Sequence, residues 1–366
     1  MNLRTPGPTP IPQDILNALS GPMIDHRGPF FRDIYDRVSA NLKELFETQN
    51  DVLMLTSSGS GGLEAAVVNT LSPNEPVLAV EIGAFGVRLG RMAETFGADV
   101  RWLRVEWGQA ATAESVAEAL DANPDVTSVL ITHNETSTGI TNPIGEIAQV
   151  VKQRDKLLIV DAVSSLGSLP CPVDEWGIDV VITGSQKGWM APPGLAMVSL
   201  SDRAWDAVEK STMPKFYFDL KQARDYSARS QTPWTPAIPI FYALDASLSQ
   251  LLDEGLPAIH ARHQAAGDRI RAGVKSLGLS LFAENEAYAS NTVTAIKCPD
   301  GIAVADIRKA AADMDVVLAG GQARLSDSIF RIGHLGHMPN EELDEALDVL
   351  GKALQQVGFA PATANV

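Results

Sequence analysis

The chain has 366 residues, which is too long for one ordinary hydrophobic core and favours two domains, or one large domain with an appendage. Lys and Arg number 29 against 45 Asp and Glu, so the formal charge is −16 at pH 7. An acidic chain of this kind is a poor general binder of nucleic acid or anionic membranes, because both are bound largely through clustered Lys and Arg. Hydrophobic residues at 45% and charged residues at 20% are ordinary globular values and exclude disorder.

Cysteine usage and the first residues predict a soluble, cytoplasmic protein. Cys171 and Cys298 are far apart and lack metal-ligand spacing, which fits a reducing compartment without a disulfide framework. The opening residues, MNLRTPGP, contain no apolar signal core. No run approaches the roughly 18 apolar residues of a membrane helix. The most apolar long stretch, 237–252, contains Asp245 and predicts a buried or interface helix.

Short apolar runs alternate with helical patterns between about residues 50 and 200. Continuous apolar runs, rather than alternating ones, are typical of strands buried on both faces. The succession of strand and helix predicts a mostly parallel, doubly wound α/β sheet, whose ligands bind beyond the carboxyl ends of the strands. The predicted strands are 52–56, 76–81, 100–105, 127–132, 157–160, 179–183 and 195–200, and the predicted helices are 63–71, 87–96, 113–120 and 144–153.

The pattern changes after residue 200 and predicts a smaller C-terminal α+β domain. We predict an N-terminal arm at 1–15, a large domain at 16–254 and a small domain at 255–366, with a loose tail from residue 360. The predicted helices of this part are 235–252, 257–277, 303–314 and 341–357, and its predicted strands are 291–296 and 328–332.

A glycine-rich turn, SSGSGG at residues 57–62, lies between a predicted strand and a predicted helix. Backbone N–H groups at a helix N-terminus, together with serine hydroxyls, form a phosphate cradle. The turn is not a Walker loop, since no Gly-Lys pair follows, and Glu64 replaces the third glycine of the dinucleotide fingerprint. A phosphate cradle and a tight turn with an N-cap serine are both compatible with this spacing.

Two charged residues follow neighbouring apolar strands. Asp161 closes the strand 157–160, where a carboxylate binds a buried cation or caps the next turn. Lys187 follows the strand 179–183 and is delivered toward the ligand edge of the sheet. Neutralising a lysine of pKa about 10.4 at pH 7 costs about 4.6 kcal/mol. Desolvation meets that cost, and a Schiff base with a carbonyl cofactor avoids it. The alternative is a lysine that contacts a helix C-terminus or a carboxylate.

A phosphate cradle, a carboxylate and a lysine on one sheet edge are what pyridoxal phosphate needs. Further motifs occur in order with them, and together they cover nearly the whole chain. On these residues the chain resembles the class V aminotransferases of fold type I, and among them the alanine–glyoxylate and serine–glyoxylate group. The motifs are TPGPT at 5–9, DHR at 25–27, SGSGGLE at 58–64, NETSTG at 134–139, DAVSS at 161–165, GSQK at 184–187, PPG at 192–194 and FRIG at 330–333.

The resemblance implies a seven-stranded sheet in the large domain and a cofactor role for each matched residue. Lys187 would form the Schiff base with pyridoxal phosphate and then transfer protons as general base and acid. Asp161 would bind the pyridine nitrogen and keep it protonated. The other implied contacts are Ser58, Gly59, Ser60 and Gln186 to the phosphate, Phe85 stacked on the ring, Thr136 near the 3-oxygen and Val163 on the other ring face.

The resemblance also implies substrate and subunit contacts. Arg331 would bind the substrate carboxylate, which its planar guanidinium matches, although an ion pair inside the small domain is the alternative. The Gly7 backbone would approach the same carboxylate. Thr235 corresponds to a phosphate contact donated by the neighbouring subunit, which implies an obligate homodimer. His26, beside Arg27, would line the substrate entrance.

We therefore expect a transaminase that moves the amino group of alanine or serine to glyoxylate or another short 2-oxo acid by a ping-pong mechanism. Aspartate, aminoethylphosphonate and ureidoglycine aminotransferases are the alternatives within this class; for an acidic donor, Arg27 is the candidate second cation. A non-catalytic, hydrogenase-associated relative is the alternative from another class. Cys298 lacks a desulfurase motif context, and the spaced histidines lack a carboxylate at metal-site spacing, so no metal is expected.

Overall fold

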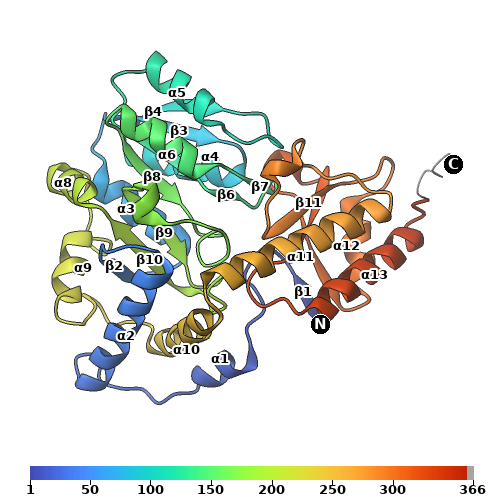
Figure 1. The fold of residues 1–366 in the computed structure, drawn as a ribbon, viewed down its shortest axis with the longest axis horizontal. Coiled ribbons are helices and arrows are strands. Elements are labelled where there is room, and N and C mark those ends of the chain that lie inside the picture. The colour runs from blue at the N-terminus through green and yellow to red at the C-terminus, as the bar shows by residue number, and fades with distance from the viewer. Residues whose placement is uncertain (361–366) are drawn as a thin grey trace.

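The computed structural model describes residues 1–360, which form two lobes built around two β-sheets (Figure 1). The larger lobe contains a seven-stranded sheet of order β2-β10-β9-β8-β5-β3-β4. Its strands are parallel from β9 to β4, and only β10 runs antiparallel to its neighbours. The predicted mostly parallel sheet is confirmed. The strands are β2 (Val52–Ser57), β3 (Pro76–Glu81), β4 (Asp99–Arg104), β5 (Ser128–Thr132), β8 (Leu157–Asp161), β9 (Val180–Gly184) and β10 (Gly194–Leu200).

Helices cover both faces of this sheet because successive strand residues point to opposite sides. On β2, Val52 and Met54 contact one hydrophobic core, whereas Leu53 and Leu55 contact the other. The first core is closed by α1 (Gln13–Ala18), α2 (Pro29–Leu45), α5 (Ala113–Ala122), α6 (Ile144–Gln153), α7 (Val173–Trp176) and α10 (Ile238–Glu254). The second is closed by α3 (Gly59–Thr70), α4 (Ala84–Thr95), α8 (Asp202–Lys210) and α9 (Leu220–Ser227).

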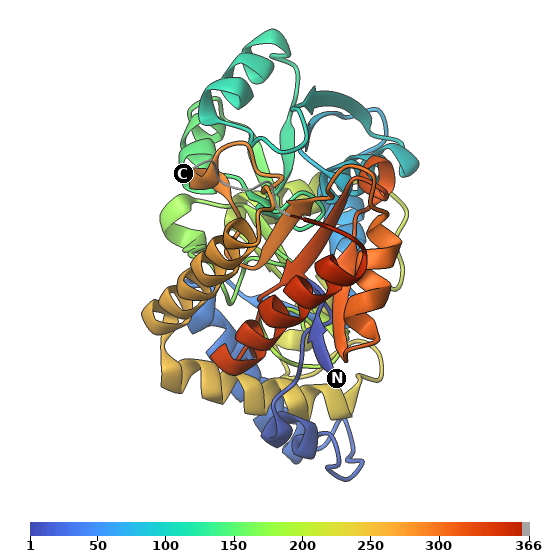
Figure 2. The ribbon, with the colours of Figure 1, turned by 90° about the vertical axis from the view of Figure 1, so that its right-hand side faces the viewer.

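The smaller lobe has a four-stranded sheet of order β1-β12-β13-β11, and the very start of the chain supplies its edge. There, β1 (Asn2–Arg4) runs parallel to β12 (Val316–Gly320), which lies antiparallel to β13 (Ile329–Gly333). β11 (Val293–Lys297) closes the other side. Figure 2 shows α11 (Leu256–Ser276) and α13 (Asn340–Gln356) packed side by side over this sheet, and α12 (Val304–Ala312) also joins the core.

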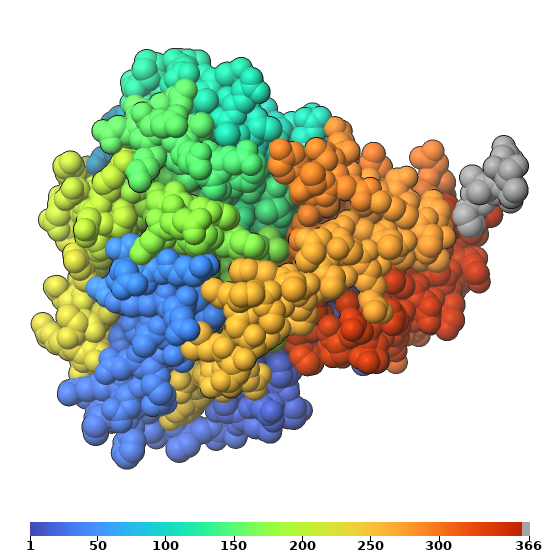
Figure 3. Space-filling model, in the orientation of Figure 1, coloured from blue at the N-terminus to red at the C-terminus, as the bar shows by residue number. Residues whose placement is uncertain are grey.

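Helix α11 connects the two lobes. Its Ile259 belongs to the first core of the larger lobe, whereas Ile270 and Val274 belong to the core of the smaller one. In the space-filling view the helix passes from one lobe onto the other (Figure 3). The domain limits at residues 15 and 254 remain a prediction, and the predicted tail lies outside the described residues except for Ala360. Among residues 1–360, no helix combines the length and apolarity needed to cross a membrane.

The neighbouring strands β5, β8 and β9 end at the same edge of the large sheet. Thr132 pairs with Asp161, and Asp161 pairs with Ile182, so the segments after these three strands emerge together. The two-stranded ribbon of β6 (Asn134–Glu135) and β7 (Ile140–Thr141) follows β5 at this edge. The topology thus gathers the motifs that begin at residues 134, 161 and 184 in one place.

Candidate active site

A cavity of about 200 Å³ lies at the carboxyl ends of β5, β8 and β9. Nine of the ten predicted cofactor residues line it, and the exception is Thr235. Five further residues complete the lining, and sequence reasoning assigned none of them: Leu63, Arg88, Thr132, Asn134 and Ser164. Both of the predicted catalytic residues, Lys187 and Asp161, are in this cavity.

Lys187 follows β9 and is partly buried, and its Nζ donates a hydrogen bond to the Pro6 carbonyl at 2.7 Å. Burial is the main reason why the pKa of Lys187 falls to about 8; Asp161 opposes this shift, and the charges of Arg331 and Arg88 add to it. Gly7 has a φ of +137°, and a Cβ at this position would collide with the Lys187 side chain. Only glycine lets the chain start approach the amine so closely.

Asp161 ends β8 with its carboxylate in the cavity. The backbone N–H of Val163 donates to Oδ1 at 3.0 Å, which orients the carboxylate. Desolvation raises the pKa of Asp161 to about 6, and the charge of Glu135 raises it further, while Lys187 and Arg88 act in the opposite direction. A cationic group placed against this carboxylate would offset the cost of burying its charge.

The glycine-rich turn forms the N-terminus of α3 and borders the cavity. The Ser58 side chain makes no capping hydrogen bond to the helix, so its hydroxyl is not committed to the turn. A Cβ on Gly59 would lie 2.9 Å from Cγ2 of Val163, which explains the glycine at this position. The buried Oε1 of Gln186 accepts no hydrogen bond from the described part of the chain. The free N–H groups at the start of α3 suit an anionic ligand. The unpaired Oε1 of Gln186 is an acceptor, so this amide would contact an anion only through its Nε2 donor.

Glu135 is a buried residue of the site that sequence reasoning missed. Its Oε2 accepts the backbone N–H groups of Phe85 and Gly86 at 3.0 Å each, and its Oε1 accepts the Ser137 hydroxyl at 2.6 Å. The carboxylate therefore holds the N-terminus of α4 and fixes the backbone that carries Phe85. The motif NETSTG contained this residue, but its acceptor role depends on a helix that is 50 residues away in the chain.

Arg331 lies in β13 of the smaller lobe and reaches the ribbon after β5. Its Nε donates to the Gly320 carbonyl and its Nη1 to the Thr136 carbonyl, both at 2.8 Å. Burial lowers the pKa of Arg331 to about 10, and Glu135 opposes the shift, so the guanidinium keeps its charge at neutral pH. None of the ion pairs within residues 1–360 involves Arg331, which argues against the alternative of a structural ion pair.

Five candidate residues are not part of the cavity lining, and the two substrate candidates, Gly7 and Arg331, are among them. Thr235 is exposed just before α10, and His26 is not part of the cavity lining. Arg27 donates to Gln231 and to the carbonyls of Thr232 and Pro233 at 2.7–3.1 Å. These bonds hold Arg27 against that loop, and Arg27 is not part of the cavity lining. Arg88 does line the cavity, and its guanidinium lies 4.7 Å from the centroid of the Phe85 ring.

This fold and cavity agree with the comparison to known families. The family model of class-V aminotransferases matches residues 3–338, and the chain belongs to that family. The predicted resemblance is confirmed, and the mixed α/β fold is that of the solved fold type I aminotransferases.

Individual relatives are similar along almost the whole chain. The soluble hydrogenase small subunit of Synechococcus sp. (strain PCC 6716) is 41% identical over 99% of this chain and 94% of its own. The L-aspartate–glyoxylate aminotransferase of Paracoccus denitrificans is 39% identical over 97% of this chain and 90% of its own. The crystal structure of pyridoxamine–pyruvate aminotransferase from Mesorhizobium loti superposes with a TM-score of 0.95. Its sequence is 31% identical, and the match covers 99% of this chain and 94% of that one.

Proposed function

We propose that the protein is a pyridoxal-phosphate-dependent transaminase that moves the amino group of a small amino acid to glyoxylate or another short 2-oxo acid. The observation that carries this proposal is the meeting of Lys187, Asp161 and the N-terminus of α3 in one cavity. These three features match the amine, the pyridinium partner and the phosphate anchor that the cofactor requires.

The residues present fit pyridoxal phosphate by several independent observations. The uncommitted Ser58 hydroxyl and the first N–H groups of α3 suit the phosphate, and the Nε2 donor of Gln186, which lines the cavity, would add to them. Phe85 and Val163 line the cavity and offer apolar surfaces to an aromatic ring. When bound, the cofactor supplies an electron sink for the negative charge that develops at the substrate Cα.

The charged side chains at the candidate site have distinct tasks in this proposal. The Asp161 carboxylate holds a proton on the ring nitrogen of the cofactor, because a cation there relieves its own desolvation. The lowered pKa of Lys187 leaves a larger neutral fraction at neutral pH, so Nζ can take a proton from the substrate Cα and return it. Arg331, whose Nε and Nη1 donate to backbone carbonyls, offers its positive charge and its Nη2 donor to the substrate carboxylate. The absence of a side chain at Gly7 leaves room beside Nζ.

Homodimerisation is part of the proposal. Thr235 adjoins an exposed aromatic cluster in which Tyr217 stacks on Trp234 at 5.6 Å between ring centroids and Phe216 is 78% exposed. An aromatic patch of this kind is typical of a protein interface. We propose that a second copy covers it and brings its Thr235 to the phosphate end of the cavity.

Alanine and serine are the proposed donors, and aspartate is a second candidate. Arg88 favours aspartate, because this guanidinium lines the cavity and offers a partner for a second carboxylate. The Paracoccus relative is named for the same donor and for glyoxylate.

A panel of donors with glyoxylate, pyruvate and 2-oxoglutarate tests the proposed reaction. We expect the purified, cofactor-loaded protein to convert glyoxylate to glycine with at least one of alanine, serine and aspartate, and Lys187→Ala to abolish turnover. If aspartate is the donor, Arg88→Gln lowers kcat/KM for aspartate by roughly tenfold and leaves that for alanine within twofold. A protein that binds no pyridoxal phosphate would instead support a non-catalytic role such as that of a hydrogenase subunit.

A further inference from the structure

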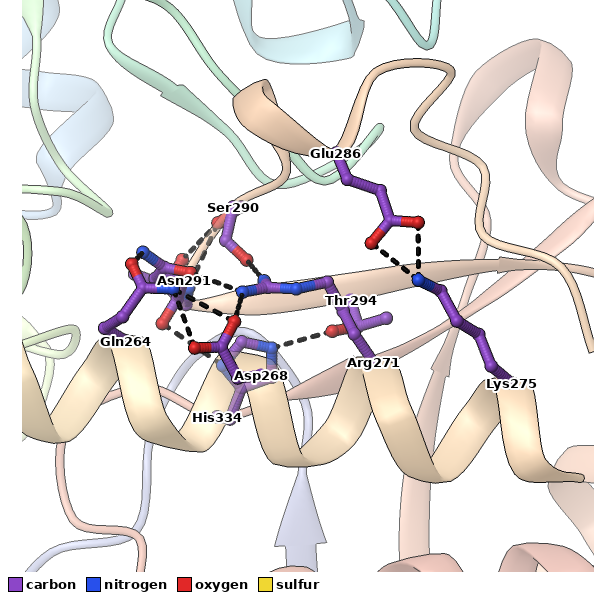
Figure 4. Close-up of polar contacts among 10 residues, drawn as sticks. Gln264, Asp268, Arg271, Lys275, Glu286, Ser290, Asn291, Thr294 and His334 are labelled. Atoms are coloured by element: carbon purple, nitrogen blue, oxygen red, sulfur yellow. Dashed lines mark hydrogen bonds and ion pairs between the residues drawn. The ribbon is translucent and has the colours of Figure 1, made fainter.

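A buried polar network connects α11 to the segment before β11, and the proposed chemistry does not use it. Figure 4 shows Arg271 extending from α11 toward Ser290 and Asn291. Its guanidinium donates to the Ser290 carbonyl and to Oδ1 of Asn291 at 2.9 Å each, and to Oδ1 of Asp268 at 2.6 Å. Because Arg271 is only 7% exposed, these bonds fix the segment firmly against the helix.

The network continues from this segment to the wall of the cavity. The Ser290 and Thr292 hydroxyls are 3.1 Å apart, and Thr292 Oγ1 accepts Nδ2 of Asn134 at 2.9 Å. Nδ2 of Asn134 also donates to the Ser164 hydroxyl at 2.9 Å. All four side chains are buried, and the last two line the cavity. An unbroken chain of hydrogen bonds therefore joins the smaller lobe to the site.

The Asn134 amide is fully committed to protein partners. Besides the bonds of Nδ2 to Thr292 and Ser164, its Oδ1 accepts the Thr141 hydroxyl at 2.8 Å. Asn134 thus joins three segments: the ribbon after β5, the turn after β8 that carries Val163, and the smaller lobe. It shapes the cavity wall without offering a free group to a ligand.

We propose that Thr292 is a positioning residue, whose hydroxyl holds Asn134 against Ser164 and so sets the cavity wall that meets the cofactor. The inference rests on the proposed function, since it requires pyridoxal phosphate as the ligand. Without this hydroxyl one Nδ2 hydrogen keeps only the longer contact to the Ser164 carbonyl at 3.3 Å, and the amide turns to improve that bond. Ser164 and the adjacent Val163 then shift, and the cofactor is bound more weakly.

The backbone around Thr292 does not depend on its hydroxyl. The Thr292 carbonyl accepts the His334 N–H at 2.9 Å, and the Thr292 N–H donates to Ser290 at 3.1 Å. Thr292→Val has nearly the same shape and removes one hydroxyl, and these two backbone hydrogen bonds of the segment remain.

Thr294 is a matched control on the same segment. It is also buried, and its hydroxyl lies 2.9 Å from Nε2 of His334, away from the cavity lining. The Kd for pyridoxal phosphate is measured by absorbance titration of the apo-protein, together with its thermal unfolding. We expect Thr292→Val to raise Kd about tenfold and Thr294→Val to leave it within about twofold, with the two apo-proteins unfolding at similar temperatures.

Thr292→Ser retains the hydroxyl and is expected to bind the cofactor within about twofold of the wild type. An unchanged Kd for Thr292→Val, or an equal rise for both valine variants, overturns the proposal. If Thr292→Val does not fold, the Kd of Thr292→Ser for pyridoxal phosphate tests the proposal instead. A tenfold rise in that Kd overturns the proposal. If the wild-type protein itself does not bind pyridoxal phosphate, the proposed function fails, which is distinct from failure of this inference.

Discussion

At the scale of single residues, burial sets the protonation of the two charged groups at the centre of the cavity. Lys187 loses solvent and becomes a weaker base, while Asp161 loses solvent and becomes a weaker acid. The two shifts bring both pKa values, about 8 and about 6, close to neutral pH. This is the range in which a group can accept and release a proton during turnover.

The pKa of Lys187 predicts how the apo-protein takes up pyridoxal phosphate. Only the neutral amine attacks the cofactor aldehyde, so the association rate should rise about tenfold per pH unit below pH 8 and level off above it. Stopped-flow absorbance from pH 6 to pH 10 measures this rate. A rate that still rises steeply between pH 9 and pH 10 would indicate a lysine with an ordinary pKa.

The raised pKa of Asp161 predicts that ionising this carboxyl destabilises the folded apo-protein. A salt-bridged aspartate, whose pKa is lowered, has the opposite effect. The folded pKa of Asp161 is raised from 3.8 to about 6, so ionisation destabilises the apo-protein as pH rises through that interval. Asp161→Asn should therefore raise the free energy of unfolding by about 3 kcal/mol at pH 7 and by less at pH 5. Urea unfolding of the apo-protein at both pH values measures the gain. A gain that is equal at both, or a loss, contradicts the raised pKa.

Sequence alone predicted most of the residues that line the cavity, but it did not predict Arg88 among them. Lys187 and Asp161 follow apolar strands, and that position is visible in the sequence. Arg88 lies on an exposed turn of α4 and Arg27 within a matched motif, so only the tertiary structure reveals that Arg88 lines the cavity while Arg27 binds a distant loop. The same holds for Glu135, whose partners come from α4.

At the scale of elements, α3 begins earlier than the sequence predicts because its first turn is built from glycine and serine. Hydrophobic periodicity becomes visible only at Leu63, whereas the helix starts at Gly59. β12 was not predicted either. It is a run of five small and apolar residues, and in so short a run hydrophobic periodicity does not distinguish a strand from the end of a helix. Helix α2 was not predicted, although its buried residues Phe31, Ile34, Val38, Leu42 and Leu45 follow helical spacing.

The close packing of Gly59 predicts the effect of adding one methyl group. In Gly59→Ala the Cβ meets Val163 at 2.9–3.1 Å, so Val163 must move into the cavity. We expect a loss of about 1–3 kcal/mol in stability and a roughly tenfold weaker binding of pyridoxal phosphate. Gly351→Ala in α13 is the control, since its Cβ meets only Leu277 at 3.3 Å. Urea unfolding and absorbance titration compare the two variants, and equal effects on cofactor binding would contradict the packing argument.

At the scale of the whole molecule, the candidate site depends on both lobes and on the chain start. Lys187 and Asp161 belong to the larger lobe and Arg331 to the smaller one, while residues 5–7 pack between Lys187 and Gly333. β1 anchors this segment by pairing with β12. Sequence analysis predicted residues 1–15 as an arm, but pairing with a strand more than 300 residues away leaves no local signal.

The exposed aromatic cluster predicts that assembly and cofactor binding change together. Phe216→Glu places a charge in the proposed subunit interface and should convert the dimer to monomers, with roughly tenfold weaker binding of pyridoxal phosphate because Thr235 of the second copy is lost. Lys309→Glu, on the exposed face of α12, is the control. Analytical ultracentrifugation with cofactor titration tests this prediction. A monomeric wild type with full cofactor affinity would contradict it.

The most direct test of the central claim identifies the residue that holds the cofactor. The protein is incubated with pyridoxal phosphate, reduced with borohydride and digested, and the pyridoxyl-modified lysine is located by mass spectrometry. The account predicts modification at Lys187 in the wild type, and loss of both the modification and the visible absorption band in Lys187→Ala. Modification of a different lysine, or a band that persists in Lys187→Ala, would contradict it.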